Sequence, residues 1–365
     1  MTATVGVQAM KRSTALRVMV VGSMPPPVGG TTVSLRQLCD FLATSTESCI
    51  VVDSSPRQSG MARALVRTAR QLWRDRREVD VVSLHFSDRA AITAGPLLWL
   101  LCRFAGKPVI YRQFGGEFAR TFFALPAALR WWLQHTILRS DAVLMQTKSM
   151  VECFSRISPN VHWFPTARES TSLRCQLHFA VDPTRPLRCV FVGHVRRAKG
   201  VLTAVEAVNR VARATLDIYG PLVDVDEAEL TGPGIRYRSA LAPANVQPTM
   251  IDYALLLFPS RYPGEGYPGT LVESAMVGLP IVVSRWQALP EMFTEDEAIF
   301  VDAGSVEQLA SEIQRIADHP ALLRARSEAL LRRARDFDAV TVFGRFVRIC
   351  NEMRSTRVVN NARRV

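Results

Sequence analysis

Two glutamates beside a glycine-rich loop are the residues of this sequence best suited to chemistry. Glu265 and Glu273 have seven residues between them, and the stretch 260–269 around Glu265 contains three glycines and two prolines. Such a loop, when it leads into a helix, presents free backbone N–H groups that can bind an anion. Carboxylates beside an anion site are useful when they accept hydrogen bonds from something else, such as sugar or ribose hydroxyls.

The elements around this loop can be predicted from hydrophobic runs and breakers. The apolar run at 253–258 predicts a buried strand, and a short helix should start at Thr270 and end near Gly278. Residues 281–284 predict the next strand. A local alternative stays open, because Thr270 and Glu273 also have the spacing of a capping box, which would make Glu273 a helix-start residue only.

The segment EGYPGTLVESAMVGLPIVVS closely resembles the E-x7-E signature of the retaining, nucleotide-sugar-dependent glycosyltransferases of family 4. The flanking FPS and LPEM also match that family. The resemblance covers most of the chain, strongly from about 187 to 317 and weakly in the N-terminal half. It implies an α/β protein of the GT-B fold, with two Rossmann-like domains whose parallel sheets face an inter-domain cleft. It also implies metal-independent sugar transfer with retention, and no cofactor besides the nucleotide-sugar.

The same resemblance assigns donor-side roles by motif position. Glu273 would hold the ribose hydroxyls, and Glu265, the catalytic glutamate, would hold hydroxyls of the donor sugar. Lys199 and an arginine would hold the diphosphate. The position of the family arginine is His194 here, so either Arg196 or Arg197 could take its role. The alternative is that this segment is only a solvated basic turn. The other expected donor-binding residues are Gly29, Gly30, Tyr219, Gly220, Gly266, Tyr267, Pro268, Gly269 and Thr270.

The acceptor side departs from the family pattern. The loop RQFGGEF resembles a His-Gly-Gly-Asp type loop, but its histidine position is Phe114, followed by two glycines and Glu117. The catalytic candidates there are His85, at the end of a predicted strand at 79–86, and Glu117, with Arg112 as a further candidate. Glu117 could equally be a surface residue. If the leaving phosphate itself deprotonates the acceptor hydroxyl, the missing histidine is compatible with activity.

Chain length and pattern predict two domains. The 365 residues suffice for two cores, and a strand, a glycine loop and a helix open each half. We predict an acceptor-binding domain at 1–170, a polar linker at 167–176 and a donor domain at 177–340. A helix and tail at 341–365 could cross back to the first domain, with the tail frayed from Ser355. Asp53 ends a predicted strand, where a loop-capping role is favoured over an NAD-type ribose contact.

The net charge of +12 is placed unevenly, because residues 1–175 contain 22 Lys and Arg against 11 Asp and Glu. Such a half favours an anionic partner. Residues 61–77 predict a basic amphipathic helix with arginines at spacings of three and four, which could lie on an anionic bilayer or be the solvated face of a packed helix. The paired tryptophans 131 and 132 suit a bilayer interface or a core equally.

These features together predict a bacterial hexosyltransferase that uses a UDP- or GDP-sugar. The expected acceptor is a saccharide, carried on a polyprenyl diphosphate, in surface polysaccharide synthesis, and no nucleic acid partner is expected. We expect a cytoplasmic protein that is peripheral at the inner face of the membrane, with free thiols and no signal peptide or span. The alternatives are another GT-B enzyme, such as a sugar-nucleotide epimerase, and a catalytically silent membrane-binding scaffold.

Overall fold

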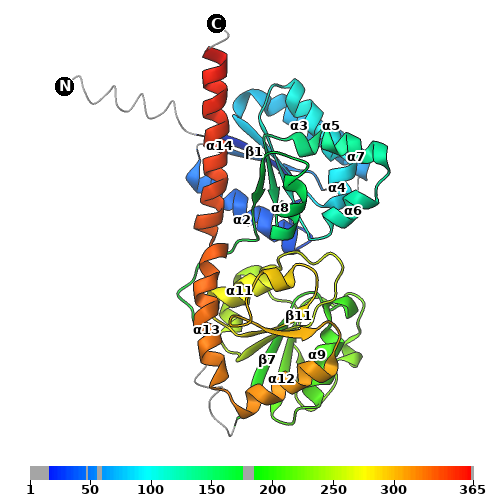
Figure 1. Ribbon diagram of the computed structural model, residues 1–365, viewed down its shortest axis with the longest axis vertical. Coiled ribbons are helices and arrows are strands. Elements are labelled where there is room, and N and C mark those ends of the chain that lie inside the picture. The colour runs from blue at the N-terminus through cyan, green and yellow to red at the C-terminus, as the bar shows by residue number, and fades with distance from the viewer. Residues whose placement is uncertain (1–15, 47, 56–59, 176–184, 363–365) are drawn as a thin grey trace, which may run out of the picture. The chain divides into compact units, whose positions relative to one another are not determined.

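The computed structural model describes residues 16–46, 48–55, 60–175 and 185–362 (Figure 1). The chain forms two compact units: unit 1 comprises Met1–Phe164 with Val342–Val365, and unit 2 comprises Pro165–Thr341. The predicted start of the second domain at residue 177, the first 15 residues and the last three of the predicted tail lie outside the described residues.

Unit 1 is built on a parallel sheet of six strands in the order β2-β1-β3-β4-β5-β6. Its strands are β1 (Arg17–Gly22), β2 (Ser48–Asp53), β3 (Val81–Phe86), β4 (Val109–Gln113), β5 (Ala142–Met145) and β6 (Val161–Trp163). Its helices are α2 (Gly30–Ser45), α3 (Met61–Asp75), α4 (Asp88–Thr93), α5 (Gly95–Phe104), α6 (Phe118–Ala124), α7 (Ala127–Gln134) and α8 (Lys148–Ser155). The central strands are continuous apolar runs, as expected where helices cover both faces of a sheet.

Unit 2 repeats this plan with the strand order β12-β11-β10-β7-β8-β9, again all parallel. Its strands are β7 (Leu187–Val192), β8 (Ala214–Tyr219), β9 (Ile235–Tyr237), β10 (Leu255–Phe258), β11 (Ile281–Arg285) and β12 (Ile299–Asp302). Its helices are α9 (Val201–Asn209), α10 (Val246–Met250), α11 (Gly269–Val277), α12 (Val306–Asp318) and α13 (Leu322–Arg333). The predicted α/β class with parallel sheets is therefore confirmed.

The strand order of unit 2 determines where a ligand is expected. From β7 the chain winds outward through β8 and β9, then returns to the other side of β7 and winds outward again through β10, β11 and β12. The strand order therefore reverses between β7 and β10. In open parallel sheets, ligands bind beyond the carboxyl ends of the strands at such a switch point. The loops that follow Val192 and Phe258 are the ones that meet there.

Helix α14 (Ala339–Ala362) begins at the end of unit 2, and most of it belongs to unit 1. Within unit 1 its Phe343 ring packs 5.5 Å from that of Phe41, and its Phe346 ring lies 6.0 Å from that of Phe164. The sequence predicted fraying from Ser355, but the helix continues to Ala362. No helix in the described part of the chain is both long enough and apolar enough to cross a membrane.

Two local predictions differ from the structure. Helix α13, which is rich in arginine and leucine, was not predicted, because its apolar periodicity is weak. Pro268, not Thr270, is the N-cap residue of α11, so Thr270 and Glu273 do not form a capping box. Asp53, in contrast, caps a loop as expected, because its Oδ1 accepts hydrogen bonds from the N–H groups of Met24 and Ser55.

Candidate functional site

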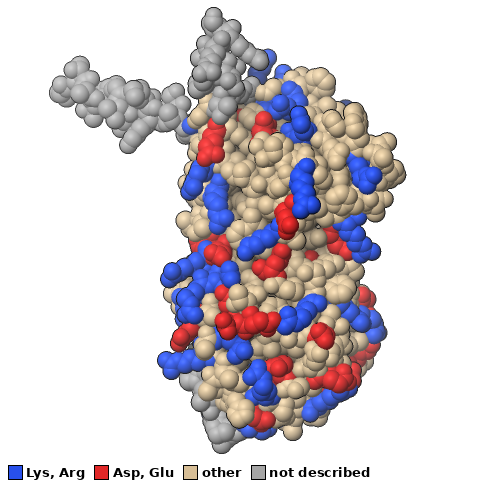
Figure 2. Space-filling view, in the orientation of Figure 1, with Lys and Arg blue, Asp and Glu red and all other residues tan. Residues whose placement is uncertain are grey.

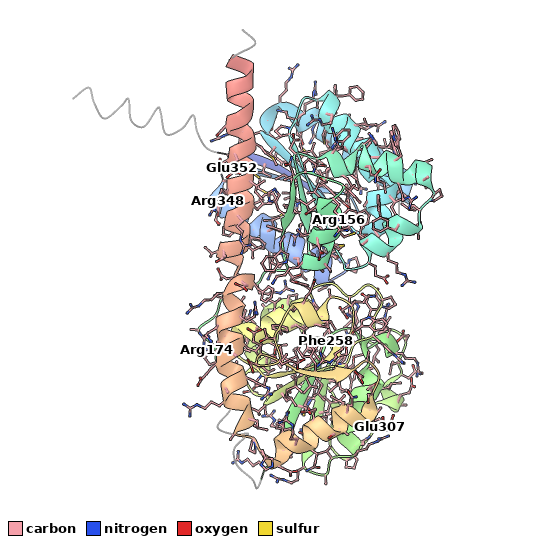
Figure 3. All side chains as sticks on the ribbon, in the orientation of Figure 1. Arg156, Arg174, Phe258, Glu307, Arg348 and Glu352 are labelled. Carbon is pink, nitrogen blue, oxygen red and sulfur yellow. The ribbon has the colours of Figure 1, made fainter. Side chains whose placement is uncertain are left out.

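A partly buried lysine–glutamate pair lies at the switch point of the unit 2 sheet. Lys199 follows β7 and Glu265 follows β10, whose last residue, Phe258, is labelled in Figure 3. The Nζ of Lys199 lies 2.7 Å from both carboxylate oxygens of Glu265. The hydroxyl of Ser260 donates to Oε2 of the same carboxylate at 2.5 Å. Because the Glu265 side chain is only 6% exposed, this carboxylate is held in one orientation.

The two loops that carry this pair are fastened to each other through their backbones. The N–H of Arg261 donates to the carbonyl of Ala198 at 2.8 Å. Gly200 has a φ of +77°, and a Cβ there would lie 2.0 Å from the carbonyl oxygen of Pro259. Only glycine permits this left-handed turn at such a close backbone approach. The approach brings Lys199 within reach of Glu265.

A second buried ion pair fixes the other glutamate of the motif. Glu273 lies in the second turn of α11, and its Oε1 is 2.6 Å from Nε of Arg168. The Glu273 and Arg168 side chains are 10% and 5% exposed. Burial raises the pKa of the Glu273 carboxyl, and the positive charge of Arg168 opposes that rise. The guanidinium therefore holds the carboxylate in place and favours its charged form.

The segment between the two glutamates leads into the N-terminus of α11. Tyr267 is buried, and its carbonyl accepts a hydrogen bond from the Thr166 hydroxyl at 2.6 Å. Pro268 precedes the helix and Gly269 is its first residue. The first N–H groups of a helix have no partner within it and carry the positive end of the helix dipole. The predicted residues Gly266, Tyr267, Pro268, Gly269 and Thr270 thus run from Glu265 into the first turn of α11, and their contact with the donor stays a prediction.

The structure separates the two candidate arginines. The guanidinium of Arg196 lies 5.5 Å from the ring centre of Tyr262, the same ring that Lys199 approaches to 4.9 Å. Arg197 instead pairs with Glu229 at 2.5 Å, on a more exposed surface. Because Tyr262 belongs to the loop after β10, Arg196 is the arginine on the side of the Lys199–Glu265 pair.

Tyr219 and Gly220, predicted to bind the donor, lie at the end of β8. A Cβ on Gly220 would lie 1.7 Å from the carbonyl oxygen of Gly193, so this glycine allows the loops after β7 and β8 to touch. The hydroxyl of Tyr219 lies 3.0 Å from that of Tyr253, which in turn donates to Asp217 at 2.7 Å. These contacts give Tyr219 and Gly220 a clear packing role next to the β7 loop.

The predicted residues of unit 1 lie near the carboxyl ends of its strands. His85 lies near the carboxyl end of β3 and is 2% exposed. Its Nε2 lies 2.8 Å from the Ser83 hydroxyl. Burial, with a smaller contribution from the charge of Arg112, lowers the pKa of His85 well below its ordinary value, so its imidazole is neutral. Glu117 precedes α6 and pairs with Arg120 at 3.0 Å.

The two glycines at the start of α2 are also in unit 1, whereas all the other predicted donor-binding residues belong to unit 2. Gly30 has open space where a Cβ would lie, and Gly29 has only the Thr32 hydroxyl at 4.0 Å. Neither position therefore requires glycine for packing. Their expected donor contact stays a prediction.

Arg168 is the site residue that the sequence did not reveal. It lies in the polar stretch predicted as a linker, 105 residues from Glu273, and no local pattern connects the two. Its backbone is fixed by hydrogen bonds from its own N–H to the Phe337 carbonyl and from the Ala339 N–H to its carbonyl. The linker is therefore more ordered than its composition suggested.

Comparison with known proteins agrees with this geometry. Residues 186–319 match the family model described as glycosyl transferases group 1. These residues include β7 to β12, Lys199, Glu265 and Glu273, but not Arg168. No curated protein matches the sequence.

Solved structures with the same fold cover nearly all of the chain. Sucrose-phosphate synthase from Thermosynechococcus elongatus is 14% identical, with a TM-score of 0.74, and covers 93% of this chain and 100% of its own. HepE from Anabaena, solved with UDP-glucose, is 13% identical, with a TM-score of 0.67 and coverages of 94% and 99%. WaaG, a glycosyltransferase of lipopolysaccharide biosynthesis, is 14% identical, with a TM-score of 0.64 and coverages of 91% and 99%.

These findings confirm the predicted fold and the predicted family. The two parallel six-stranded sheets match the GT-B fold of glycosyltransferase structures, and the matched segment contains the paired glutamates of the E-x7-E signature. Residues 186–319 are thus those of a group 1 glycosyltransferase, in a chain that has the GT-B fold.

Proposed function

We propose that this enzyme transfers a hexose, with retention and without a metal ion, from a UDP- or GDP-sugar to a saccharide on a polyprenyl diphosphate. The observation that carries the donor half of the proposal is the partly buried Lys199–Glu265 pair beside the N-terminus of α11. A lysine and a helix N-terminus at one place form an anion site, and the carboxylate next to them is a hydroxyl acceptor. A sugar diphosphate has both kinds of group.

In this mechanism Lys199, Arg196 and the first N–H groups of α11 bind the diphosphate. They stabilise the negative charge that develops as the bond between the anomeric carbon and the phosphate oxygen breaks. Glu265 orients the donor sugar through its hydroxyls, and Glu273, held by Arg168, accepts hydrogen bonds from the ribose. The acceptor oxygen bonds to the anomeric carbon on the face that the phosphate leaves, and its proton passes to a phosphate oxygen. No step then requires a histidine.

The neighbouring structures support the choice of substrates. HepE was solved with UDP-glucose, which favours a UDP-sugar donor for this chain. WaaG acts in lipopolysaccharide biosynthesis, which favours a lipid-linked acceptor in the synthesis of a bacterial surface polysaccharide. In the proposal unit 2 binds the donor, because it contains the site, and unit 1 binds the acceptor.

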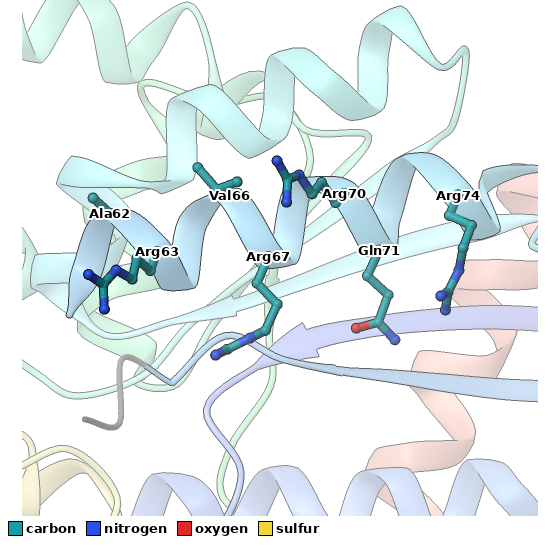
Figure 4. Close-up of a pocket in the computed structure, with 7 residues that line it drawn as sticks. All are labelled: Ala62, Arg63, Val66, Arg67, Arg70, Gln71 and Arg74. Carbon is teal, nitrogen blue, oxygen red and sulfur yellow. The ribbon is translucent and has the colours of Figure 1, made fainter. Parts of the chain in front are cut away.

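Helix α3 of unit 1 supports a membrane-bound acceptor. It packs on its own unit through Ala64, Thr68 and Leu72, all about 1% exposed or less. Its outer side has a shallow basic groove of about 620 Å³. In Figure 4 the side chains of Arg67 and Arg74 extend from one side of the helix. The residues that line the groove are Ala62, Arg63, Val66, Arg67, Arg70, Gln71 and Arg74.

Exposed apolar side chains on the other helices of unit 1 add to this basic surface. They lie on α5, α6 and α7, and are Leu97, Phe104, Phe123, Leu129 and Trp131. On the face shown in Figure 2, acidic side chains are also fewer over unit 1 than over unit 2. Arginines beside exposed aromatic and aliphatic groups suit an anionic bilayer surface. We therefore place the enzyme on the inner face of the cytoplasmic membrane, bound through unit 1.

The direct test is sugar transfer from UDP- and GDP-hexoses to a bacterial membrane fraction, with EDTA present and NMR analysis of the product. The proposal predicts a lipid-extractable product with the anomeric configuration of the donor. A Glu265→Gln variant should lose this transfer. An inverted product, or full activity of that variant, would refute the assigned mechanism.

A further inference from the structure

Unit 2 has a second basic cleft, separate from the lysine–glutamate site. Its volume is about 470 Å³. Its walls come from α11, α13, the short 3-10 helix Ala334–Phe337, the first turn of α14 and the stretch before residue 175. Arg174, labelled in Figure 3, lies in that stretch. All of these elements belong to the same compact unit.

Positive charge exceeds negative charge in this cleft. Arg174, Arg332 and Arg335 line it, and Asp338 is its one carboxylate. Asp338 already accepts hydrogen bonds from the Ser170 hydroxyl at 2.5 Å and from the Thr341 N–H at 3.1 Å. The carboxylate is thus engaged in capping α14 and does not pair with the arginines.

Two of the three guanidinium groups have no polar partner in the described part of the chain. Arg332 and Arg335 make no side-chain hydrogen bond or ion pair with any described residue, although most other arginines of unit 2 do. Arg174 donates to the carbonyls of Thr171 and Leu173. Like charges gathered in one cleft repel each other, and an anion between them relieves that repulsion.

We propose that this cleft binds a small phosphate-bearing anion. Guanidinium groups bind phosphate oxygens through paired, charge-assisted hydrogen bonds, and Thr171 belongs to the same lining. The volume exceeds that of a bare phosphate and falls in the range of small-molecule sites. Met276 and Leu331 give the cleft an apolar wall, so the ligand class is a phosphorylated metabolite with an uncharged portion.

The position of the cleft connects it to the donor site. The stretch 168–170 is paired with 337–339: Arg168 N–H donates to the Phe337 carbonyl at 3.0 Å, and Ala339 N–H donates to the Arg168 carbonyl at 2.8 Å. The same Arg168 holds Glu273. An anion in the cleft therefore acts on the segments that position Arg168, and its binding changes the affinity for the donor nucleotide. The predicted change in donor affinity rests on the proposed role of Glu273.

Inorganic phosphate is the probe for binding, measured by isothermal titration calorimetry on the full-length protein. The key variant is Arg332→Ala with Arg335→Ala, and the matched control is Arg324→Ala, on the same helix but outside the cleft. Loss of two charge-assisted hydrogen bonds should weaken binding by about tenfold or more. A Lys199→Ala variant distinguishes the donor site, because it should keep phosphate binding at the cleft.

Phosphate binding that survives in the double variant but is lost in Lys199→Ala would overturn the proposal, as would no binding to the wild type. For the connection to the donor site, the affinity for UDP or GDP is measured with and without phosphate. The proposal predicts a change of a few-fold in the nucleotide affinity of the wild type, and no such change in the double variant. An equal change in both proteins would show competition at the donor site and reject the connection. The phosphate measurement itself needs neither transfer activity nor a nucleotide.

Discussion

A Cβ on Gly269 would lie 1.7 Å from Nη2 of Arg168, which shows that the guanidinium occupies the space that a side chain at this position would fill. Gly269 is the first residue of α11, and Arg168 pairs with Glu273 one turn further along the same helix. The glycine at this point of the motif therefore admits the arginine that fixes the second glutamate. Gly269, Arg168 and Glu273 therefore form one packed cluster.

Replacing Gly269 with alanine should disrupt this cluster. Arg168 would have to move away from Glu273, and breaking a buried ion pair costs about 3–5 kcal/mol in the free energy of unfolding. We expect a lower melting temperature and a loss of at least about tenfold in nucleotide affinity. Gly344→Ala is the control, because that glycine also lies in a helix and has open space at its Cβ. Equal behaviour of the two variants in thermal unfolding and calorimetry would contradict the assignment.

Lys199 and Arg197 should differ sharply in their contribution to catalysis. Lys199 is partly buried against Glu265, whereas Arg197 pairs with Glu229 nearer the surface. Removing a preorganised group that stabilises transition-state charge costs about 100- to 1000-fold in kcat. We therefore expect a loss of that size for Lys199→Met and less than about tenfold for Arg197→Met, measured as steady-state transfer. A similar loss in both variants would place Arg197 in the site after all.

His85 should make stability depend on pH. Because its folded pKa lies well below 6.5, the unfolded chain binds a proton at His85 before the folded chain does. Its contribution to stability is complete above pH 6.5 and is lost as the pH falls, by at most about 1.4 kcal/mol per pH unit. Denaturant unfolding between pH 5 and 8 should show a shallower pH dependence for His85→Gln than for the wild type. Parallel curves would mean that the folded and unfolded pKa values of His85 are the same.

The basic face of α3 should control membrane binding. Reversing the charge of Arg63 and Arg70 together should weaken binding to vesicles containing anionic lipid by more than about tenfold, since each arginine near such a surface contributes about 1 kcal/mol. Binding by the wild type should also fall as salt rises. The matched control reverses Arg210 and Arg324, two exposed arginines of unit 2. If both pairs weaken vesicle binding equally, only the net charge matters and α3 is not the binding surface.

Much of the proposed donor site could be predicted because its signals are local. The strand predicted at 281–284 is observed at Ile281–Arg285, and the glycines and prolines around Glu265 indicate a loop that leads into a helix. The ion pairs could not be predicted. Lys199 and Glu265 are 66 residues apart, and they meet only because β7 and β10 are neighbours in the sheet.

The failures have the same physical origin. Arg168 lies in a polar stretch that resembles a linker, and its burial depends on contacts with α11 and with the start of α14. The choice between Arg196 and Arg197 depends on the position of Tyr262 in a distant loop. The capping-box alternative for Glu273 was wrong because tertiary pairing with Arg168, not local hydrogen bonding, determines its position.

The central claim is that the Lys199–Glu265–Glu273 site binds a nucleoside diphosphate-sugar. It is tested most directly by thermal unfolding in EDTA with UDP, GDP, ADP or NAD, since a ligand of the folded state raises the melting temperature. We predict that UDP or GDP raises it in the wild type and not in Glu273→Ala, whereas Arg197→Ala keeps the increase. An increase with NAD alone, or one that persists in Glu273→Ala, would contradict this account of the site.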